Sequence, residues 1–596
     1  MSQLQSLRAA RSLHDVAALL HFKPKGLAFI LYRKPPQTKY QSFDIAKRGG
    51  GVRHINAPAP DLKLLQRRLS ELLQDCVDEI NRARQFQDQM AHGFKRGRSI
   101  ISNATKHRKR KYVFNIDLQD FFPSINFGRV RGFFLKNTDF ALEPAIATIL
   151  AQIACHDNYL PQGSPCSPVV SNLIGHVLDV RLSRLAFENG CIYSRYADDI
   201  TFSTSEPNFP GSIAEPDVQP HEWKVGGKLD QIVARAGFAI NSQKTRMQYR
   251  TSRQDVTGLV VNSTVNIRAD YRRRVRAMAH RLFMTGQFEL VQTVADATGV
   301  LTPTRVPGTI AQLHGMLGHI DRVDWYNVET KAGADDRHEK GQPGLGSKEN
   351  LYRRFLMFKE FYAAQAPVVI CEGKTDNIYL LHAIRALASS YPNLASISSN
   401  NAIVLNVRIF KYPNTSTGRI LRLGGGTGDL SKFIPQYVAE LTRFKAPGKL
   451  HPVLLLVDND DGAKPLFSIA RQFTKGKFDP TKGFVHVFEQ LYLVPTPIPA
   501  GGGASVIENS FGASIWNLTL GGKQFSPKSK SDPTTHFGKH ILSQYVQNNA
   551  GKIDFSGFAE ILRRLNAAID DYRMSSAPTT GVAAISTQQQ VAGAQT

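Results

Sequence analysis

Short runs rich in apolar residues predict five strands in this chain, three in its first half and two in its second. They cover residues 111–118, 191–195, 200–204, 366–371 and 451–457. Apolar runs of this length, bounded by turn residues, are typical of buried strands. Acidic residues lie at the end of these strands or in the turns between them, so the same pattern predicts where carboxylates gather.

Two segments repeat one kind of residue at helical spacing. Residues 61–81 place leucines on one face, which predicts an amphipathic helix. Residues 269–284 carry arginines on a helical pattern, including Arg272, Arg273 and Arg276. A basic helix of this kind suits contact with phosphates, and a solvated surface is the alternative interpretation.

Polar segments predict where the chain is divided. Residues 331–350 are polar and rich in glycine, as domain linkers are. Residues 205–225 are rich in Pro, Glu and Gly, which predicts a surface insertion. Residues 575–596 hold too few large apolar side chains to form a core, so we expect them to be disordered.

Composition narrows the class of protein. A chain of 596 residues predicts several domains, and a net charge of +25 indicates a polyanionic partner such as nucleic acid. The 5 cysteines are scattered, which favours reduced thiols over a disulfide framework or a zinc site. We see neither a membrane-spanning run nor a signal-peptide pattern, so we expect a cytoplasmic protein.

The candidate chemistry begins at Asp198 and Asp199, in the turn between two predicted strands. Adjacent carboxylates repel each other unless a cation lies between them. Mg²⁺ prefers carboxylate and phosphate oxygens, and two such ions can stabilise the attacking and leaving oxygens of a phosphoryl transfer. Asp117 ends a neighbouring strand and would project toward this turn. The alternatives are ordinary turn chemistry for the pair and a helix cap for Asp117.

Further motifs follow the order of a known family. Residues 160–165 read LPQGSP, residues 237–241 read GFAIN, and residues 256–262 read VTGLVVN. Together with the strand-end aspartate and the YADD turn, these motifs resemble those of reverse transcriptases. The resemblance implies a right-hand polymerase in which Asp117, Asp198 and Asp199 hold Mg²⁺.

The resemblance also implies a pocket for the incoming dNTP. Phe122 would lie under the sugar and exclude a 2′-hydroxyl, and Gln162 would line the pocket. Lys244 would stand near the leaving pyrophosphate, where a cation stabilises developing charge. Arg53 is a candidate for gripping the triphosphate, with a solvated arginine as the alternative.

Two short elements resemble retron reverse transcriptases in particular. Asn103-Ala104-Thr105-Lys106-His107 is similar to their NAxxH element, and Val256-Thr257-Gly258 is similar to their VTG element. The RNA-binding residues implied are Asn103, His107, Val256, Thr257, Gly258, Arg272, Arg273 and Arg276. The resemblance implies a cognate non-coding RNA, priming from a 2′-hydroxyl, and a branched RNA–DNA product called msDNA. A reverse transcriptase of repair or transposition, with no RNA of its own, is the alternative.

A second acidic cluster is predicted in the C-terminal half. Glu372 follows one predicted strand, and Asp458 and Asp460 follow another, with a Gly-rich stretch at residues 424–428 between them. Alternating strands and helices indicate a parallel α/β domain, in which the carboxyl ends of strands share one edge. We therefore expect these carboxylates to converge.

This arrangement resembles a TOPRIM domain, the Mg²⁺-dependent fold of some nucleases, topoisomerases and primases. The resemblance implies that Glu372, Asp458 and Asp460 are catalytic and hold Mg²⁺, while Glu508 and Lys539 are left open. It implies an antiphage nuclease held in check by msDNA, with tRNA or another nucleic acid as its target, and leaves open an oligomer with msDNA. A catalytically silent msDNA-binding module is the alternative, and a primase is a weaker one.

The expected fold class is an α+β right-hand polymerase followed by a small α/β TOPRIM domain with a parallel sheet. The expected divisions are an N-terminal region with the fingers (1–110), a palm (111–262), a thumb (263–330), a linker (331–350), a TOPRIM domain (351–500), its C-terminal extension (501–574) and the tail (575–596).

Overall fold

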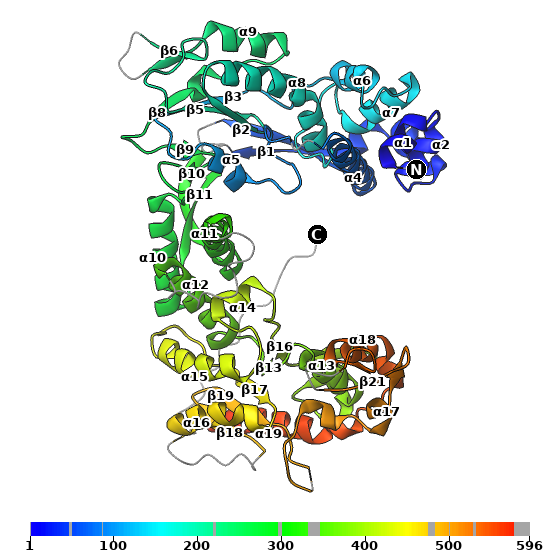
Figure 1. The fold of residues 1–596 in the computed structure, drawn as a ribbon, viewed down its shortest axis with the longest axis vertical. Coiled ribbons are helices and arrows are strands. Elements are labelled where there is room, and N and C mark those ends of the chain that lie inside the picture. The colour runs from blue at the N-terminus through cyan, green and yellow to red at the C-terminus, as the bar shows by residue number, and fades with distance from the viewer. Residues whose placement is uncertain are drawn as a thin grey trace. The chain divides into compact units, whose positions relative to one another are not determined.

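The structure is a computed structural model that divides into two compact units (Figure 1). It describes residues 2–46, 51–85, 88–217, 222–295, 301–331, 346–474, 483–499, 501–527 and 532–576. The N-terminal unit comprises Met1–Val275, Glu289–Pro307 and Gly318–Pro343. The C-terminal unit comprises Arg276–Phe288, Gly308–Leu317 and Gly344–Thr596. Among the described helices, none combines the length and the apolar character needed to cross a membrane.

The N-terminal unit is built around a four-stranded antiparallel sheet. Its strands, in spatial order, are β4 (Ile192–Tyr196), β5 (Asp199–Thr204), β3 (Tyr112–Asp117) and β8 (Arg246–Tyr249). The predicted strands at 111–118, 191–195 and 200–204 are therefore confirmed as strands. Helix α8 (Ser167–Glu188) contacts β4 and α9 (Gly227–Arg235).

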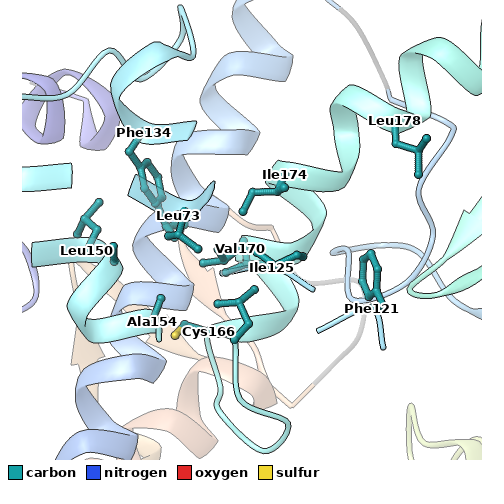
Figure 2. Close-up of a cluster of buried hydrophobic side chains, with 14 of the residues drawn as sticks. Leu73, Phe121, Ile125, Phe134, Leu150, Ala154, Cys166, Val170, Ile174 and Leu178 are labelled. Atoms are coloured by element: carbon teal, nitrogen blue, oxygen red, sulfur yellow. The ribbon is translucent and has the colours of Figure 1, made fainter. Parts of the chain in front are cut away.

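Helices supply most of the core beside this sheet (Figure 2). Leu73 of α4 (Pro60–Ala83), Phe134 of α6 (Phe127–Lys136), Leu150 of α7 (Pro144–Ala154) and Val170 of α8 meet in one buried cluster. Burying each such side chain contributes roughly 1.5–3 kcal/mol. The helix predicted at 61–81 is confirmed as α4, and its leucines face this cluster except for Leu64, which is exposed.

Smaller elements complete this part of the chain. The short helices are α1 (Gln3–Ala9), α2 (Leu13–Leu19), α3 (Pro24–Ala28) and α5 (Ile100–Lys106). The hairpins are β1 (Tyr40–Ala46) with β2 (Val52–Pro58), β6 (Ala214–Pro216) with β7 (Trp223–Val225), β9 (Asp255–Val256) with β10 (Leu259–Val260), and β11 (Glu289–Ala295) with β12 (Leu301–Pro307). The helices α10 (Ala269–Thr285) and α11 (Ile310–Lys331) follow, and α10 confirms the helix predicted at 269–284.

The C-terminal unit contains a five-stranded sheet. Its strands, in spatial order, are β16 (Arg408–Ile409), β13 (Val368–Cys371), β17 (Val453–Val457), β19 (Leu491–Pro495) and β18 (Val485–Phe488). The first four are parallel to their neighbours, and β18 is antiparallel to β19. The sheet thus departs from the expected all-parallel arrangement at β18, because β18 and β19 are joined by a short hairpin and a hairpin requires antiparallel strands.

Helices and smaller strands surround this sheet. The helices are α12 (Ser347–Met357), α13 (Asp376–Ala386), α14 (Ser416–Leu421), α15 (Thr427–Leu441), α16 (Lys464–Phe473), α17 (Ala513–Trp516), α18 (Lys539–Asn549) and α19 (Ala559–Ser576). The further strands are β14 (Ala395–Ile397), β15 (Ile403–Leu405), β20 (Thr519–Leu520), β21 (Lys523–Phe525) and β22 (His536–Phe537). One buried cluster joins β13 and β17 to α13, α18 and α19, so the segment after β19 belongs to the same core as the sheet.

Two sequence expectations fall largely outside the described residues. Of the expected linker, residues 332–345 lie outside them, and α12 begins within the remainder at Ser347. Of the expected tail, residues 577–596 lie outside them, and its first two residues end α19.

Candidate active site

Two neighbouring strands bring three carboxylates to one end of the N-terminal sheet. Asp117, the last residue of β3, pairs directly across the sheet with Asp199, the first residue of β5. Asp198 lies in the tight turn before Asp199, and its carbonyl oxygen accepts a hydrogen bond of 3.0 Å from the Leu118 amide. The structure therefore brings together the three carboxylates that the sequence predicts to converge.

The carboxylates of this turn are costly to ionise. Burial raises the pKa of Asp198, and the charge of Asp117 raises it further. Burial raises the pKa of Asp199 to about 6, with the charges of Asp198 and Asp117 adding to the effect. Burial and nearby negative charges both disfavour the ionised form of a carboxylate, and a neighbouring cation offsets them.

Lys244 supplies part of that positive charge. Its Nζ donates a hydrogen bond of 2.8 Å to Oδ1 of Asp117, and this bond raises the pKa of Lys244. The main chain before it is attached to β3, because the Asn241 amide donates to the Asp117 carbonyl at 2.8 Å. The GFAIN segment thus fixes Lys244 beside the acidic cluster.

The LPQGSP loop lies against strand β2. The Asn56 amide donates to the Gln162 carbonyl at 2.8 Å. Gly163 has φ of +119°, and a Cβ there would lie 2.7 Å from the Asn56 carbonyl oxygen, so this close approach requires glycine. Arg53, exposed on the same strand, is close enough for its charge to lower the pKa of Asp198. Strand β2 therefore connects Gln162 and Arg53 near the turn that carries Asp198 and Asp199.

Phe122 lies in an aromatic group near the turn. Its ring centroid is 6.3 Å from that of Phe94, which is in turn 6.3 Å from that of Tyr196. Phe122 is half-buried. Part of the Phe122 side chain is therefore accessible to solvent.

The NAxxH residues lie inside the protein. His107 is fully buried and its two ring nitrogens contact the hydroxyls of Ser194 and Ser203, each at 2.7 Å. Asn103, also buried, accepts a 2.6 Å hydrogen bond from Ser194 through its Oδ1. Burial lowers the pKa of His107 to about 3, so its ring is neutral at physiological pH. The side chains have no exposed surface for RNA, and any part they have in RNA binding must act through β4 and β5.

The other predicted RNA-binding residues differ in exposure. Val256 is buried, and Thr257 donates a hydrogen bond of 3.1 Å from Oγ1 to the Ile100 carbonyl, which attaches the VTG element to the start of α5. Gly258 is exposed at the tip of its hairpin. The three arginines of α10 are exposed: Arg272, Arg273 and Arg276.

The second acidic cluster lies at the carboxyl ends of β13 and β17. Glu372 accepts a 3.2 Å hydrogen bond through Oε2 from the Asp458 amide, so the two strand ends are in direct contact. Oδ1 of Asp460 accepts a 3.2 Å hydrogen bond from the Ala463 amide and caps the next helical turn. Burial raises the pKa of Glu372, and the charges of Asp376 and Asp460 raise it further. The expected convergence of these residues is present in the geometry.

Asp376 belongs to this cluster and was missed in the sequence. It begins α13, and its Oδ2 accepts a 2.8 Å hydrogen bond from the Gly373 amide. Burial, followed by the charges of Asp376, Glu372 and Glu508, raises the pKa of Asp458 to about 8. The sequence feature that could have identified Asp376 is its position four residues after Glu372. A short loop followed by a helix can place such a carboxylate back beside the end of the strand.

Glu508 and Lys539 lie in the same cluster. Glu508 is fully buried, and Lys539 Nζ lies 2.9 Å from its Oε1 and 3.0 Å from its Oε2. The charges of Glu508, Asp458 and Asp376 raise the pKa of Lys539 against the opposing effect of burial. The Gly-rich segment also borders the cluster, since the Gly426 amide donates to the Glu372 carbonyl at 3.1 Å.

Both clusters have the donor chemistry of a magnesium site. Across the part of the chain that the structure describes, no three His, Cys, Asp or Glu side chains are already arranged around a metal position. The donors are nevertheless carboxylates, which Mg²⁺ prefers. Burial and then the neighbouring negative charges raise the pKa values of Asp199 and Asp458, and a cation bound between the carboxylates would offset both effects.

Comparisons with known proteins identify the family of the N-terminal part of the chain. The reverse transcriptase (RNA-dependent DNA polymerase) family matches residues 45–266, which include β3, the turn with Asp198 and Asp199, and Lys244. This part of the chain therefore has a reverse transcriptase fold. A solved structure of telomerase from Candida albicans aligns over 53% of this chain and 63% of that chain, at 10% identity and a TM-score of 0.29, a likeness on which no conclusion rests.

Individual relatives are more specific. The chain is 36% identical to the retron Mx65 reverse transcriptase of Myxococcus xanthus, over 46% of this chain and 63% of that protein. It is 31% identical to the retron Ec86 reverse transcriptase of Escherichia coli, over 46% of this chain and 80% of that protein. The retron Mx162 reverse transcriptase of Myxococcus xanthus is 34% identical, over 46% of this chain and 59% of that protein. The chain thus spans less than two thirds of both Myxococcus proteins, and it belongs to the retron reverse transcriptase family.

Proposed function

We propose that the N-terminal half is an RNA-directed DNA polymerase whose catalytic residues are Asp117, Asp198 and Asp199. The observation that carries the proposal is the direct cross-strand pairing of Asp117 with Asp199 beside the Asp198 turn. Mg²⁺ held by these carboxylates would stabilise the charge that develops on the reacting phosphate. The division into fingers (1–110), palm (111–262) and thumb (263–330) is part of this proposal.

In the proposed reaction the primer hydroxyl attacks the α-phosphate of a dNTP. A new P–O bond forms, the bond to the leaving pyrophosphate breaks, and the hydroxyl loses its proton. Lys244 places a positive charge beside Asp117, where it can offset charge on the leaving group. Arg53 grips the triphosphate, Gln162 lines the nucleotide pocket, and the exposed part of the Phe122 ring excludes a 2′-hydroxyl.

The template in this proposal is a cognate structured RNA. Membership of the retron family supports synthesis from a 2′-hydroxyl of that RNA into branched msDNA. The exposed arginines of α10 would contact the RNA phosphates, and the buried NAxxH residues would act by supporting the palm. We place the protein in the cytoplasm.

A second activity is proposed for the C-terminal half. Two parallel strand ends hold Glu372 and Asp458 in contact, and Asp376, Glu508 and Lys539 complete a charged cluster around them. With Asp460, these residues fit a Mg²⁺-dependent TOPRIM nuclease that msDNA holds in check and phage infection releases. The cluster of ionisable groups with raised pKa values favours this role over a silent msDNA-binding module.

The polymerase proposal is tested with the purified full chain. Incorporation of dTTP on a poly(rA)–oligo(dT) template–primer is measured for wild type, Asp199→Asn and Glu372→Gln. The proposal predicts Mg²⁺-dependent synthesis by wild type and Glu372→Gln and none by Asp199→Asn. Synthesis by Asp199→Asn at the wild-type rate would contradict it, and Glu372→Gln is the matched control because it changes a carboxylate in the other cluster.

A further inference from the structure

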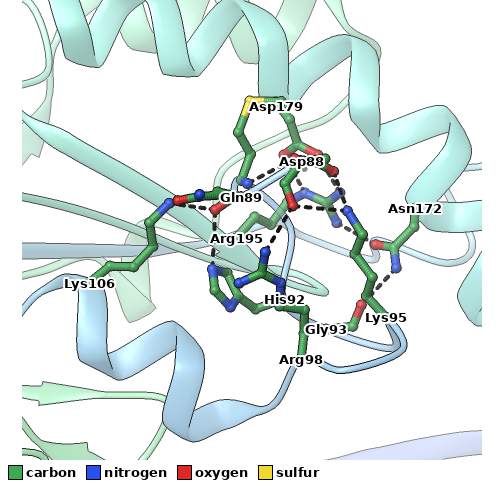
Figure 3. A network of polar contacts seen from close by, with 11 residues as sticks. Asp88, Gln89, His92, Gly93, Lys95, Arg98, Lys106, Asn172, Asp179 and Arg195 are labelled. Carbon is green, nitrogen blue, oxygen red and sulfur yellow. Dashed lines mark hydrogen bonds and ion pairs between the residues drawn. The ribbon is translucent and has the colours of Figure 1, made fainter. Parts of the chain in front are cut away.

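A buried network lies behind the catalytic turn and includes Arg195, Asp179, Asn172 and Gly93 (Figure 3). We infer that Arg195 is a positioning residue that fixes the main chain of the turn carrying Asp198 and Asp199. The expected effect on catalysis rests on the proposed polymerase activity. The expected effect on the conformation of the turn rests only on the contacts of Arg195.

Arg195 is held rigidly by Asp179 of α8. Both side chains are fully buried, Nε donates to Oδ1 at 2.7 Å, and Nη2 donates to Oδ2 at 2.7 Å. Tyr193 donates a further 2.6 Å hydrogen bond from its hydroxyl to Oδ1 of Asp179. A two-point ion pair of this kind fixes the plane of the guanidinium as well as its position.

The remaining face of the guanidinium reaches the catalytic turn. Nη1 of Arg195 donates to the Ala197 carbonyl at 3.0 Å, and Ala197 directly precedes Asp198. Ala197 has φ of +57°, a left-handed conformation that is unfavourable for a residue with a Cβ. Such a conformation persists only where the surrounding structure enforces it.

A second contact on the turn comes from Gly93. A Cβ at Gly93 would lie 2.5 Å from the Ala197 amide nitrogen, so this main-chain contact requires glycine. Asn172 connects Gly93 to Arg195, because its Nδ2 donates to the Gly93 carbonyl at 2.7 Å and its Oδ1 accepts from Nη1 of Arg195 at 3.3 Å. The turn is thus held from two sides by groups that share Asn172.

Stability alone does not require this arrangement. A buried ion pair can often be replaced by well-packed apolar side chains of similar volume without loss of stability. Here the guanidinium that Asp179 holds donates to the main chain of Ala197, the residue directly before Asp198. The geometry therefore points to placement of the turn, where small displacements of reacting groups have large effects on rate.

The test compares full-length Arg195→Lys and Asn172→Ala with wild type. Arg195→Lys keeps the positive charge but loses the guanidinium that bonds to both Asp179 and Ala197. Asn172→Ala should disturb folding less, because Asn172 is only half-buried. Arg184→Lys is the matched control, since Arg184 is an exposed arginine of α8, the helix that carries Asn172 and Asp179. Each protein is measured for amide hydrogen exchange of the peptide spanning the turn, for kcat on poly(rA)–oligo(dT), and for the half-saturating Mg²⁺ concentration.

The inference predicts faster exchange of the turn peptide in both network variants and a kcat lowered by roughly 10- to 100-fold. The half-saturating Mg²⁺ concentration, which does not depend on how much enzyme is folded, should rise severalfold. Arg184→Lys should match wild type in all three. If Arg195→Lys fails to fold, Asn172→Ala decides the outcome.

Two failures are distinguishable. If exchange, kcat and Mg²⁺ dependence stay at wild-type values in a folded network variant, Arg195 does not position the turn and the inference is overturned. If wild type shows no synthesis while exchange changes as described, the positioning of the turn stands and the proposed polymerase function is wrong.

Discussion

Nζ of Lys244 lies 2.8 Å from Oδ1 of Asp117, although the two residues are 127 positions apart in the chain. The contact forms because the segment before Lys244 is hydrogen-bonded to the end of β3. A cation is thereby placed beside Asp117, one of three carboxylates whose charges repel each other.

Replacing Lys244 should slow the reaction more than it weakens binding. We expect Lys244→Ala to lower kcat on the order of 100-fold, as loss of one group that stabilises developing charge does. Single-nucleotide extension, which separates kcat from KM for the dNTP, measures this. Lys228→Ala on the exposed face of α9 is the control, and an unchanged kcat in Lys244→Ala would exclude this role.

The requirement for Mg²⁺ should depend on pH through Asp199. Its pKa of about 6 means that a proton competes with the metal below that pH, while above it the carboxylate is ionised and ready to bind. We expect the half-saturating Mg²⁺ concentration to rise by up to about tenfold for each pH unit below 6 and to level off above 7. Mg²⁺ titrations of dNTP incorporation between pH 5 and 8 test this, and a flat profile would contradict it.

Stability of the C-terminal unit should fall as pH rises through the range set by Asp458. Its folded-state pKa of about 8 exceeds the ordinary value of 3.8, so the folded state retains a proton that the unfolded state loses. The folded state is therefore destabilised progressively from about pH 4 to pH 8, and the full cost is present above pH 8.

Asp458→Asn should remove this loss. We expect the variant to melt at a higher temperature than wild type at pH 8.5 without metal, with a smaller difference at pH 5. Mg²⁺ should raise the melting temperature of wild type and not that of the variant. Asp461→Asn is the control because Asp461 is exposed, and a wild-type transition unaffected by pH would contradict the account.

Replacing the NAxxH histidine, His107, should lower the stability of the protein and leave its RNA affinity unchanged. His107→Ala removes the partner of Ser194 and Ser203 inside the protein, which costs about 1–3 kcal/mol for each buried group left unsatisfied. We expect lower stability in urea unfolding, and unchanged RNA affinity per folded molecule.

Lys109→Ala, an exposed change in the same basic run, should do the reverse, with lower RNA affinity and unchanged stability. Filter binding of the cognate RNA at two salt concentrations, together with urea unfolding, separates the two effects. A loss of RNA affinity in fully folded His107→Ala would show that the histidine has a direct part in RNA binding.

The sequence predicts the local features of the fold well. The pattern of apolar residues over short stretches predicts one helix and three strands that the structure contains. They are the helix at 61–81 and the strands at 111–118, 191–195 and 200–204. The three carboxylates Asp117, Asp198 and Asp199 could be anticipated because each lies at a strand end or in a tight turn.

Features that depend on tertiary contacts could not be read in the same way. Arg195 looks like an ordinary strand residue until α8 brings Asp179 against it. His107 stands in a run of lysines and arginines, which suggests a surface, yet the chain turns its ring into the sheet. Asp376 joins the second cluster only because α13 starts beside the end of β13. In each case the partner lies on an element whose position the sequence pattern does not specify.

The most direct test of the account is extraction of small nucleic acids from cells that express the gene with its upstream region. Wild type is compared with Asp198→Ala/Asp199→Ala and with Glu372→Ala/Asp458→Ala. The account predicts a short branched RNA–DNA species in wild type and in the second variant, and its absence in the first. A branched species that persists in the Asp198→Ala/Asp199→Ala variant, or that is absent from wild type, would contradict the claim that these carboxylates form the polymerase centre of a retron enzyme.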